Sequence, residues 1–202
     1  MTGSLTNNPR VLLVHGVGHR RPKDHWLWWL AEELRAACVP VQYPQMPDPD
    51  DPDPVAWAAI ARAELGMLKA GGGHTVVIAH SLGTILWTHI AETLPAQLLP
   101  SRIALVAPPS RHEWAVAAPK FADIALGSLS TATTVIVGRA EDPVRNVPLA
   151  ELADAWGAPS VEIPGSGHLT PDDGHGPFPG ALPWVLGGPA EAWAETTSDV
   201  GH

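Results

Sequence analysis

The stretch that most constrains the fold is residues 75–84, Thr-Val-Val-Ile-Ala-His-Ser-Leu-Gly-Thr. A β-branched run is followed directly by apolar residues at helical spacing, which predicts a strand, an abrupt turn and a helix with Ser81 at the turn. A serine at such a turn has a strained backbone and requires small neighbours two positions away, and Ala79 and Gly83 meet this requirement. The same pattern also fits a buried strand followed by a helix-capping serine, so other motifs must decide.

Short apolar runs recur along the chain and alternate with helical patterns, which predicts an α/β fold. Continuous apolar runs are typical of strands buried on both faces of a parallel sheet. We expect a three-layer αβα sandwich with a mostly parallel sheet of about six strands, in one domain over residues 1–202 with flexible ends at 1–9 and about 195–202. The predicted strands are residues 11–14, 39–43, 75–78, 103–106, 133–137 and 160–163, and the clearest predicted helices are about 25–37, 54–70, 148–156 and 182–186.

Four candidate functional loops directly follow predicted strands, and in such folds functional groups gather beyond the carboxyl ends of the strands. The first loop is His15-Gly16-Val17-Gly18, where glycine lets the backbone approach a substrate. The N–H of Val17 would then point into the site. The N–H of Leu82, at the start of the helix behind Ser81, would point there too. The two N–H groups together predict an oxyanion hole.

The other loops supply the groups that a serine nucleophile needs. A serine hydroxyl requires an adjacent base, and the base requires a carboxylate that fixes its orientation. Asp142 and His168 follow Ser81 in that order and lie in loops after strands. Glu141 is an alternative acid, although Asp142, directly before a proline, suits the bend better. His15 and His19 lack a third ligand at suitable spacing, so we expect no metal, and no cofactor is implied.

The composition excludes some classes of function. The net charge is −9 with few lysines and arginines, and no basic run offers a footprint for nucleic acid. No apolar run approaches the length of a membrane span and no signal peptide is visible, so we expect a cytoplasmic protein that does not bind membranes. The single cysteine, Cys38, is expected to be a buried structural thiol. The abundance of Ala, Pro, Gly and Trp suggests a GC-rich bacterial source.

Several further segments border the expected site. Residues 44–54 are rich in Pro and Asp, lack the glycine and glutamate of a calcium loop, and predict a stiff, solvated loop. Asp24 is the expected N-cap of the tryptophan-rich helix that follows it, whose aromatic side chains are mostly core. Residues 110–129 predict a small helical flap over the site. The candidate pocket residues are His15, Gly16, Trp26 and His80.

These motifs together resemble the small single-domain serine hydrolases of the α/β-hydrolase superfamily typified by retinoblastoma-binding protein 9 and its bacterial relatives. The likeness extends over about residues 10–186 and implies a minimal hydrolase without a large lid. It implies Ser81, Asp142 and His168 as the triad, with the N–H groups of Leu82 and Val17 as the oxyanion hole. Residues 44–54 and the tryptophan-rich helix depart from the family pattern. The segments that carry the resemblance are residues 15–16, 24–26, 30–34, 79–83, 137–138, 142–144, 165–168 and 174–179.

The expected activity is hydrolysis of a small-molecule carboxylic ester through an acyl-enzyme. The many tryptophans and the acidic balance favour an uncharged or hydrophobic acyl group. The same residues would serve in a thioesterase or an acyltransferase, or in lactone or amide cleavage. The alternative from another class is a protein-interaction module that retains the triad as a relic, which leaves a protein partner open.

Overall fold

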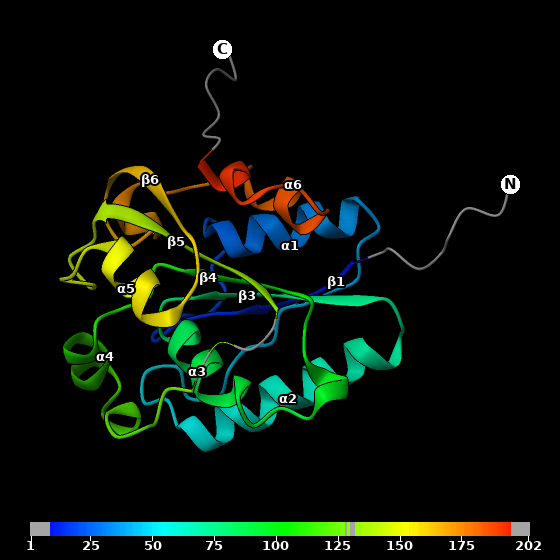
Figure 1. Ribbon diagram of the computed structural model, residues 1–202, viewed down its shortest axis with the longest axis horizontal. Coiled ribbons are helices and arrows are strands. Elements are labelled where there is room, and N and C mark those ends of the chain that lie inside the picture. The colour runs from blue at the N-terminus through cyan, green and yellow to red at the C-terminus, as the bar shows by residue number, and fades with distance from the viewer. Residues whose placement is uncertain (1–8, 128, 130–131, 195–202) are drawn as a thin grey trace, which may run out of the picture.

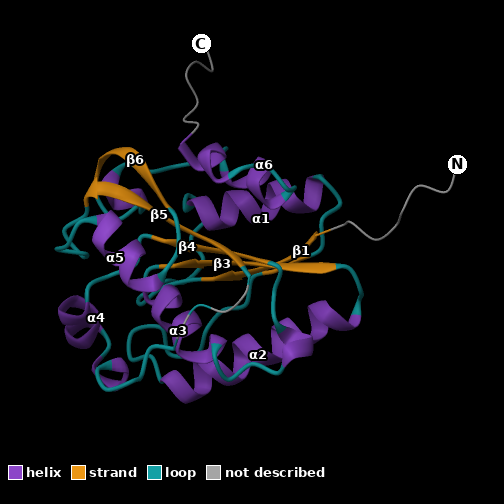
Figure 2. Ribbon diagram, viewed as in Figure 1, coloured by secondary structure: helices purple, strands orange, loops and turns teal. Residues whose placement is uncertain are grey.

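The computed structural model describes residues 9–127, 129 and 132–194, and its centre is one six-stranded sheet (Figure 2). The strand order is β2-β1-β3-β4-β5-β6, and every neighbouring pair is parallel. This confirms the predicted parallel sheet of about six strands. The strands are β1 (Pro9–Val14), β2 (Val41–Gln42), β3 (His74–His80), β4 (Arg102–Val106), β5 (Thr133–Glu141) and β6 (Ser160–Ser166).

Helices cover both faces of the sheet and complete the three layers (Figure 1). α1 (Trp26–Ala36) and α6 (Ala181–Val185) lie on one face, and α2 (Pro54–Ala70), α3 (Leu82–Ala91) and α5 (Leu149–Trp156) lie on the other. α4 (Arg111–Ala117) lies within the segment predicted as a flap. Short 3-10 turns span Ala96–Leu98, Pro119–Phe121, Pro171–Asp173 and Ala190–Ala194. Across the described residues, no helix combines the length and the apolar character needed to cross a bilayer.

The sheet separates two hydrophobic cores. Successive side chains of a strand point to opposite faces. Leu12 therefore packs in the core that contains Trp57, whereas Leu13 packs in the core that contains Trp26. All four side chains are fully buried. The expectation that most tryptophans serve the core is confirmed for these two.

Three local predictions were wrong. The N-cap of α1 is His25, because its Nδ1 accepts the N–H of Leu27 at 3.1 Å and so takes the place that we assigned to Asp24. Cys38, two residues beyond the end of α1, has a positive φ of 56° and is exposed rather than buried. Pro9 is no flexible end but the buried first residue of β1, a position that proline tolerates in a strand. The rest of the two expected flexible ends lies outside the described residues.

The Pro- and Asp-rich segment 44–54 is more firmly attached than a solvated loop. The indole N–H of Trp57 donates to the carbonyl of Pro47 at 2.7 Å, and the N–H of Gly18 donates to the carbonyl of Pro49 at 2.6 Å. Asp50 also forms an ion pair with Arg20. These contacts fix the segment beside the glycine loop that follows β1. The predicted strand at residues 39–43 is correspondingly short, since only Val41–Gln42 pair with β1.

Candidate active site

Ser81 stands on a strained turn between β3 and α3. Its φ of 53° and ψ of −128° are unfavourable for a residue with a side chain. The turn is held because the N–H of Ser81 donates to the carbonyl of Val106 at 3.0 Å. Gly83 is required, since a Cβ there would come within 2.8 Å of the carbonyl oxygens of Val14 and His15. The sequence therefore presents Ser81 at the carboxyl edge of the sheet, as the motif predicts.

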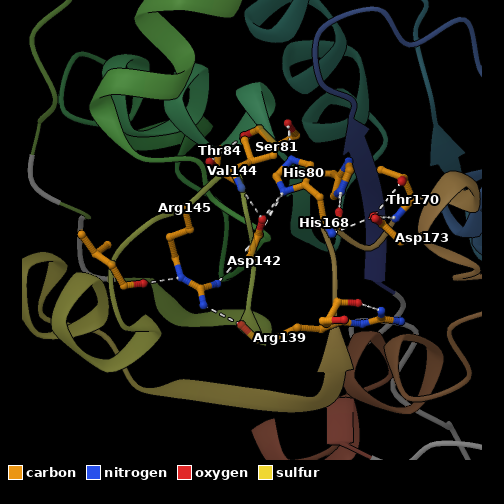
Figure 3. Close-up of polar contacts among 12 residues, drawn as sticks. His80, Ser81, Thr84, Arg139, Asp142, Val144, Arg145, His168, Thr170 and Asp173 are labelled. Atoms are coloured by element: carbon orange, nitrogen blue, oxygen red, sulfur yellow. Dashed lines mark hydrogen bonds and ion pairs between the residues drawn. The ribbon is translucent and has the colours of Figure 1, made fainter.

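Ser81, His168 and Asp142 form one hydrogen-bonded line (Figure 3). Nε2 of His168 lies 2.8 Å from Oγ of Ser81. Nδ1 of His168 lies 2.9 Å from Oδ2 and 3.2 Å from Oδ1 of Asp142. The Asp142 side chain is fully buried and that of His168 is 12% exposed. The alternative acid, Glu141, is exposed at the end of β5. Such a line can pass the serine proton to the imidazole while the carboxylate orients the ring.

Asp142 is held by its own turn and by a buried arginine that the sequence did not reveal. Its Oδ1 accepts the N–H of Val144 at 2.9 Å. The guanidinium of Arg145 lies behind it, with Nη1 3.9 Å from Oδ2 and the side chain 1% exposed. Arg145 also donates to the carbonyls of Arg139, Ala140 and Val147, at 2.5, 3.0 and 2.8 Å. A buried cation with these partners fixes the loop that carries Asp142.

The glycine loop after β1 lies directly against the serine turn. A Cβ on Gly16 would lie 2.6 Å from Cβ and 2.9 Å from Oγ of Ser81, so only glycine fits at this contact. It would also lie 3.4 Å from the backbone nitrogen of Leu82. Leu82 is the first residue of α3, so its N–H has no carbonyl within the helix to bind. The two backbone segments predicted to form an oxyanion hole are thus neighbours.

His15 fixes the peptide that carries the N–H of Val17. Its Nε2 accepts the N–H of Met46 at 2.9 Å, so Nδ1 carries the proton and donates to the carbonyl of Gly16 at 2.8 Å. Because the C=O and N–H of a trans peptide point in opposite directions, the N–H of Val17 points away from His15. Burial lowers the pKa of His15 to about 4, although the Gly16 carbonyl raises it, so the ring stays neutral.

A cavity of about 590 Å³ opens beside Ser81 and His168. Of the predicted pocket residues, Gly16 and His80 line it. His15 and Trp26 were assigned wrongly, since both side chains are fully buried outside the lining, His15 against the glycine loop and Trp26 in the core. The predicted flap contributes two α4 residues to the wall. The apolar side chains of the lining belong to Val17, Pro22, Ala117, Val144 and Pro171, and the charged ones to Arg20, Glu113 and Asp172.

Further imidazoles pack one against another between the cavity and the core. The ring centroid of His25 lies 4.5 Å from that of His19 and 5.1 Å from that of His80, which in turn lies 5.3 Å from that of His168. Burial lowers the pKa of His25 to about 3 and that of His19 to about 2. Burial also holds the pKa of His80 well below its usual value, with a smaller contribution from His25. The rings of His19, His25 and His80 are therefore uncharged at neutral pH.

A parallel sheet flanked by helices, with a serine on a strand-to-helix turn at its carboxyl edge, defines the class of α/β hydrolases. The particular family follows from the sequence. The chain belongs to the serine hydrolase family, whose model matches residues 11–185.

Solved structures of hydrolases share this fold. The ydeN gene product from B. subtilis superimposes with a TM-score of 0.71 at 22% identity, covering 89% of this chain and 100% of that chain. A YdeN-like hydrolase from Pectobacterium atrosepticum gives 0.68 at 20% identity, covering 89% of both chains. Est1E from Butyrivibrio proteoclasticus, solved with bound ferulic acid, gives 0.59 at 14% identity, covering 80% and 82%. No curated protein sequence matches the chain significantly.

Proposed function

We propose that this hydrolase cleaves carboxylic esters through a covalent acyl-enzyme formed on Ser81. The observation that carries the proposal is the unbroken line from Oγ of Ser81 through His168 to the buried Asp142, with the first distance 2.8 Å and the second 2.9 Å. His168 removes the serine proton, and the alkoxide attacks the ester carbonyl. Asp142 holds the ring and stabilises the imidazolium that forms.

The N–H groups of Leu82 and Val17 stabilise the negative charge that develops on the carbonyl oxygen. Two observations support them: the contact between Gly16 and the serine turn, and the hydrogen bond from His15 to the Gly16 carbonyl, which leaves the N–H of Val17 pointing away from His15. Each such donor typically contributes about 100- to 1,000-fold in rate. His168 then protonates the leaving alcohol, and a water activated in the same way releases the acid.

The substrate that fits the cavity best is an uncharged ester of small or medium size. Five apolar side chains line the cavity, and the guanidinium in its lining, that of Arg20, already forms an ion pair with Asp50. The carboxylates of Glu113 and Asp172 disfavour an anionic acyl group. The structure of Est1E, which shares this fold, contains ferulic acid, a carboxylic acid of the kind that ester hydrolysis releases.

The test is active-site labelling followed by turnover. The wild type and Ser81→Ala are treated with a fluorophosphonate and weighed by intact-mass spectrometry, and both are assayed on short and medium p-nitrophenyl esters. Ser101→Ala is the matched control, because Ser101 lies at the opposite edge of the sheet, where its Oγ donates to the carbonyl of Thr75. We expect stoichiometric labelling and turnover that only Ser81→Ala loses.

The other outcomes separate the alternatives. Labelling without turnover would support Ser81 as the nucleophile. It would favour a thioester, a lactone or an amide as the substrate, or acyl transfer to a second alcohol as the reaction. An unlabelled wild type would refute the proposal and favour an interaction module with a relic triad.

A further inference from the structure

The main chain around His168 is strained on both sides. Gly167 has a φ of +106° and Leu169 a φ of +56°. A left-handed conformation is unfavourable for leucine, so neighbouring groups must hold this segment in place. The ring of His168 can keep its 2.8 Å contact with Oγ of Ser81 only if its own backbone is fixed. The contacts of that backbone are therefore decisive.

The N–H of His168 is held by Asp173. Oδ2 of this carboxylate accepts the N–H of His168 at 2.7 Å, and also the N–H and hydroxyl of Thr170 at 3.2 and 2.8 Å (Figure 3). A Cβ on Gly167 would lie 2.6 Å from Cγ of Asp173, so glycine is needed for the carboxylate to lie this close. Burial raises the pKa of Asp173, but hydrogen bonds from Thr170 and from the N–H of His168 outweigh it and lower the pKa overall.

The carbonyl of His168 is held by His80. A carbonyl can only accept, so Nε2 of His80 carries a proton and donates it to this oxygen at 3.0 Å. His80 is 2% exposed and directly precedes Ser81. This hydrogen bond thus joins the segment that carries the nucleophile to the segment that carries the base.

We propose that Asp173 and His80 are positioning residues that clamp the main chain of His168 from both sides and so place its ring against Ser81. The inference rests on the proposed function, because it assumes that His168 is the base. Both residues bond to the backbone of His168 rather than to its ring or to Oγ of Ser81. Loss of either residue would lower kcat and the rate of fluorophosphonate labelling, and loss of Asp173, which does not line the cavity, would leave KM for a neutral ester the same. A displacement of the ring by about 1 Å typically costs on the order of 100-fold in rate.

The experiment compares two substitutions at one position with a matched control. Asp173→Ala removes the acceptor, whereas Asp173→Asn keeps an oxygen for the N–H of His168 and loses only the charge. Asp53→Ala is the control, because Asp53 also caps backbone N–H groups, those of Val55 and Ala56 at 2.9 Å, at the start of α2. Labelling rate, kcat, KM and melting temperature are measured for all four proteins.

We expect Asp173→Ala to label 10- to 100-fold more slowly (about one to two decades), with KM unchanged and Asp173→Asn close to the wild type. Asp53→Ala should lose stability and keep its labelling rate. If the wild type is labelled and Asp173→Ala is labelled at a rate within about twofold of the wild-type rate, the clamp is refuted but the proposed function is not. If the wild type is not labelled, both the clamp and the proposed function are refuted. If Asp173→Ala does not fold, His80→Leu and His80→Gln decide. Glutamine retains a donor, so His80→Gln should label faster than His80→Leu, and equal labelling rates of these two variants would contradict the clamp.

Discussion

Acidification should destabilise this fold well before its carboxylates are protonated. His15, His25 and His80 are almost completely buried and uncharged, with pKa values of about 4 and 3 for the first two and well below the usual value for His80. In the unfolded chain each histidine has its ordinary pKa of about 6.5. Below that pH the unfolded state binds protons that the folded state does not bind, so stability falls as the pH falls.

The magnitude follows from linkage. Lowering the pH from 7.5 to 5.5 protonates each of these residues in the unfolded chain, while the same three rings stay uncharged in the folded protein. Each therefore contributes a loss of about 1.4 kcal/mol, or about 4 kcal/mol for the three together. Carboxylates add little in this range, because their ordinary pKa is near 4 and they are ionised in both states. A domain typically has about 5 to 15 kcal/mol of stability, so the loss is a large fraction of it.

The measurement is urea unfolding at pH 7.5, 6.5 and 5.5, followed by tryptophan fluorescence and by circular dichroism. His25→Asn is the informative variant, because asparagine also caps a helix and the substitution removes one of the buried imidazoles that titrate only in the unfolded chain. It should reduce the loss between pH 7.5 and 5.5 by about 1.4 kcal/mol. A wild type that loses less than about 1 kcal/mol over this range would refute the reasoning.

Three further substitutions test separate features. Gly16→Ala should abolish fluorophosphonate labelling of Ser81, because the added Cβ would lie 2.6 Å from the serine Cβ. Gly66→Ala is the control, because its added Cβ would meet nothing within 4 Å. It should be labelled normally and melt at a slightly higher temperature by differential scanning fluorimetry. Arg145→Met should cost about 3 kcal/mol in urea unfolding, since three carbonyls lose their donor, and an unchanged midpoint would contradict this. Asp53→Ala should cost about 1 kcal/mol in the same assay through loss of the α2 cap.

Periodicity and motif spacing were enough to predict the sheet and the neighbours of Ser81. The central strands are apolar throughout, and their loops meet at one edge whatever the detailed packing, so the approach of Asp142 and His168 to Ser81 follows from topology alone. For the same reason the proximity of the glycine loop to Ser81 could be anticipated.

Long-range hydrogen bonds could not be predicted in this way. His15 and Trp26 have residue types suited to a pocket, but which way each side chain points depends on partners such as Met46, 31 positions from His15. Arg145 gave no signal, because a buried guanidinium is rare and its partners are backbone carbonyls. Asp173 could have been found, since it stands three residues after Thr170 in a capping-box pattern.

The contact between Ser81 and His168 joins positions 87 residues apart, and this has a consequence for how the protein matures. During synthesis Ser81 leaves the ribosome long before His168. Until His168 has been made and placed, Ser81 has no base to remove its proton. Closing so long a loop is a late event in folding. We therefore expect an incomplete chain to be unreactive toward acyl donors, so that the reactivity of Ser81 reports the moment at which the last strand joins the sheet.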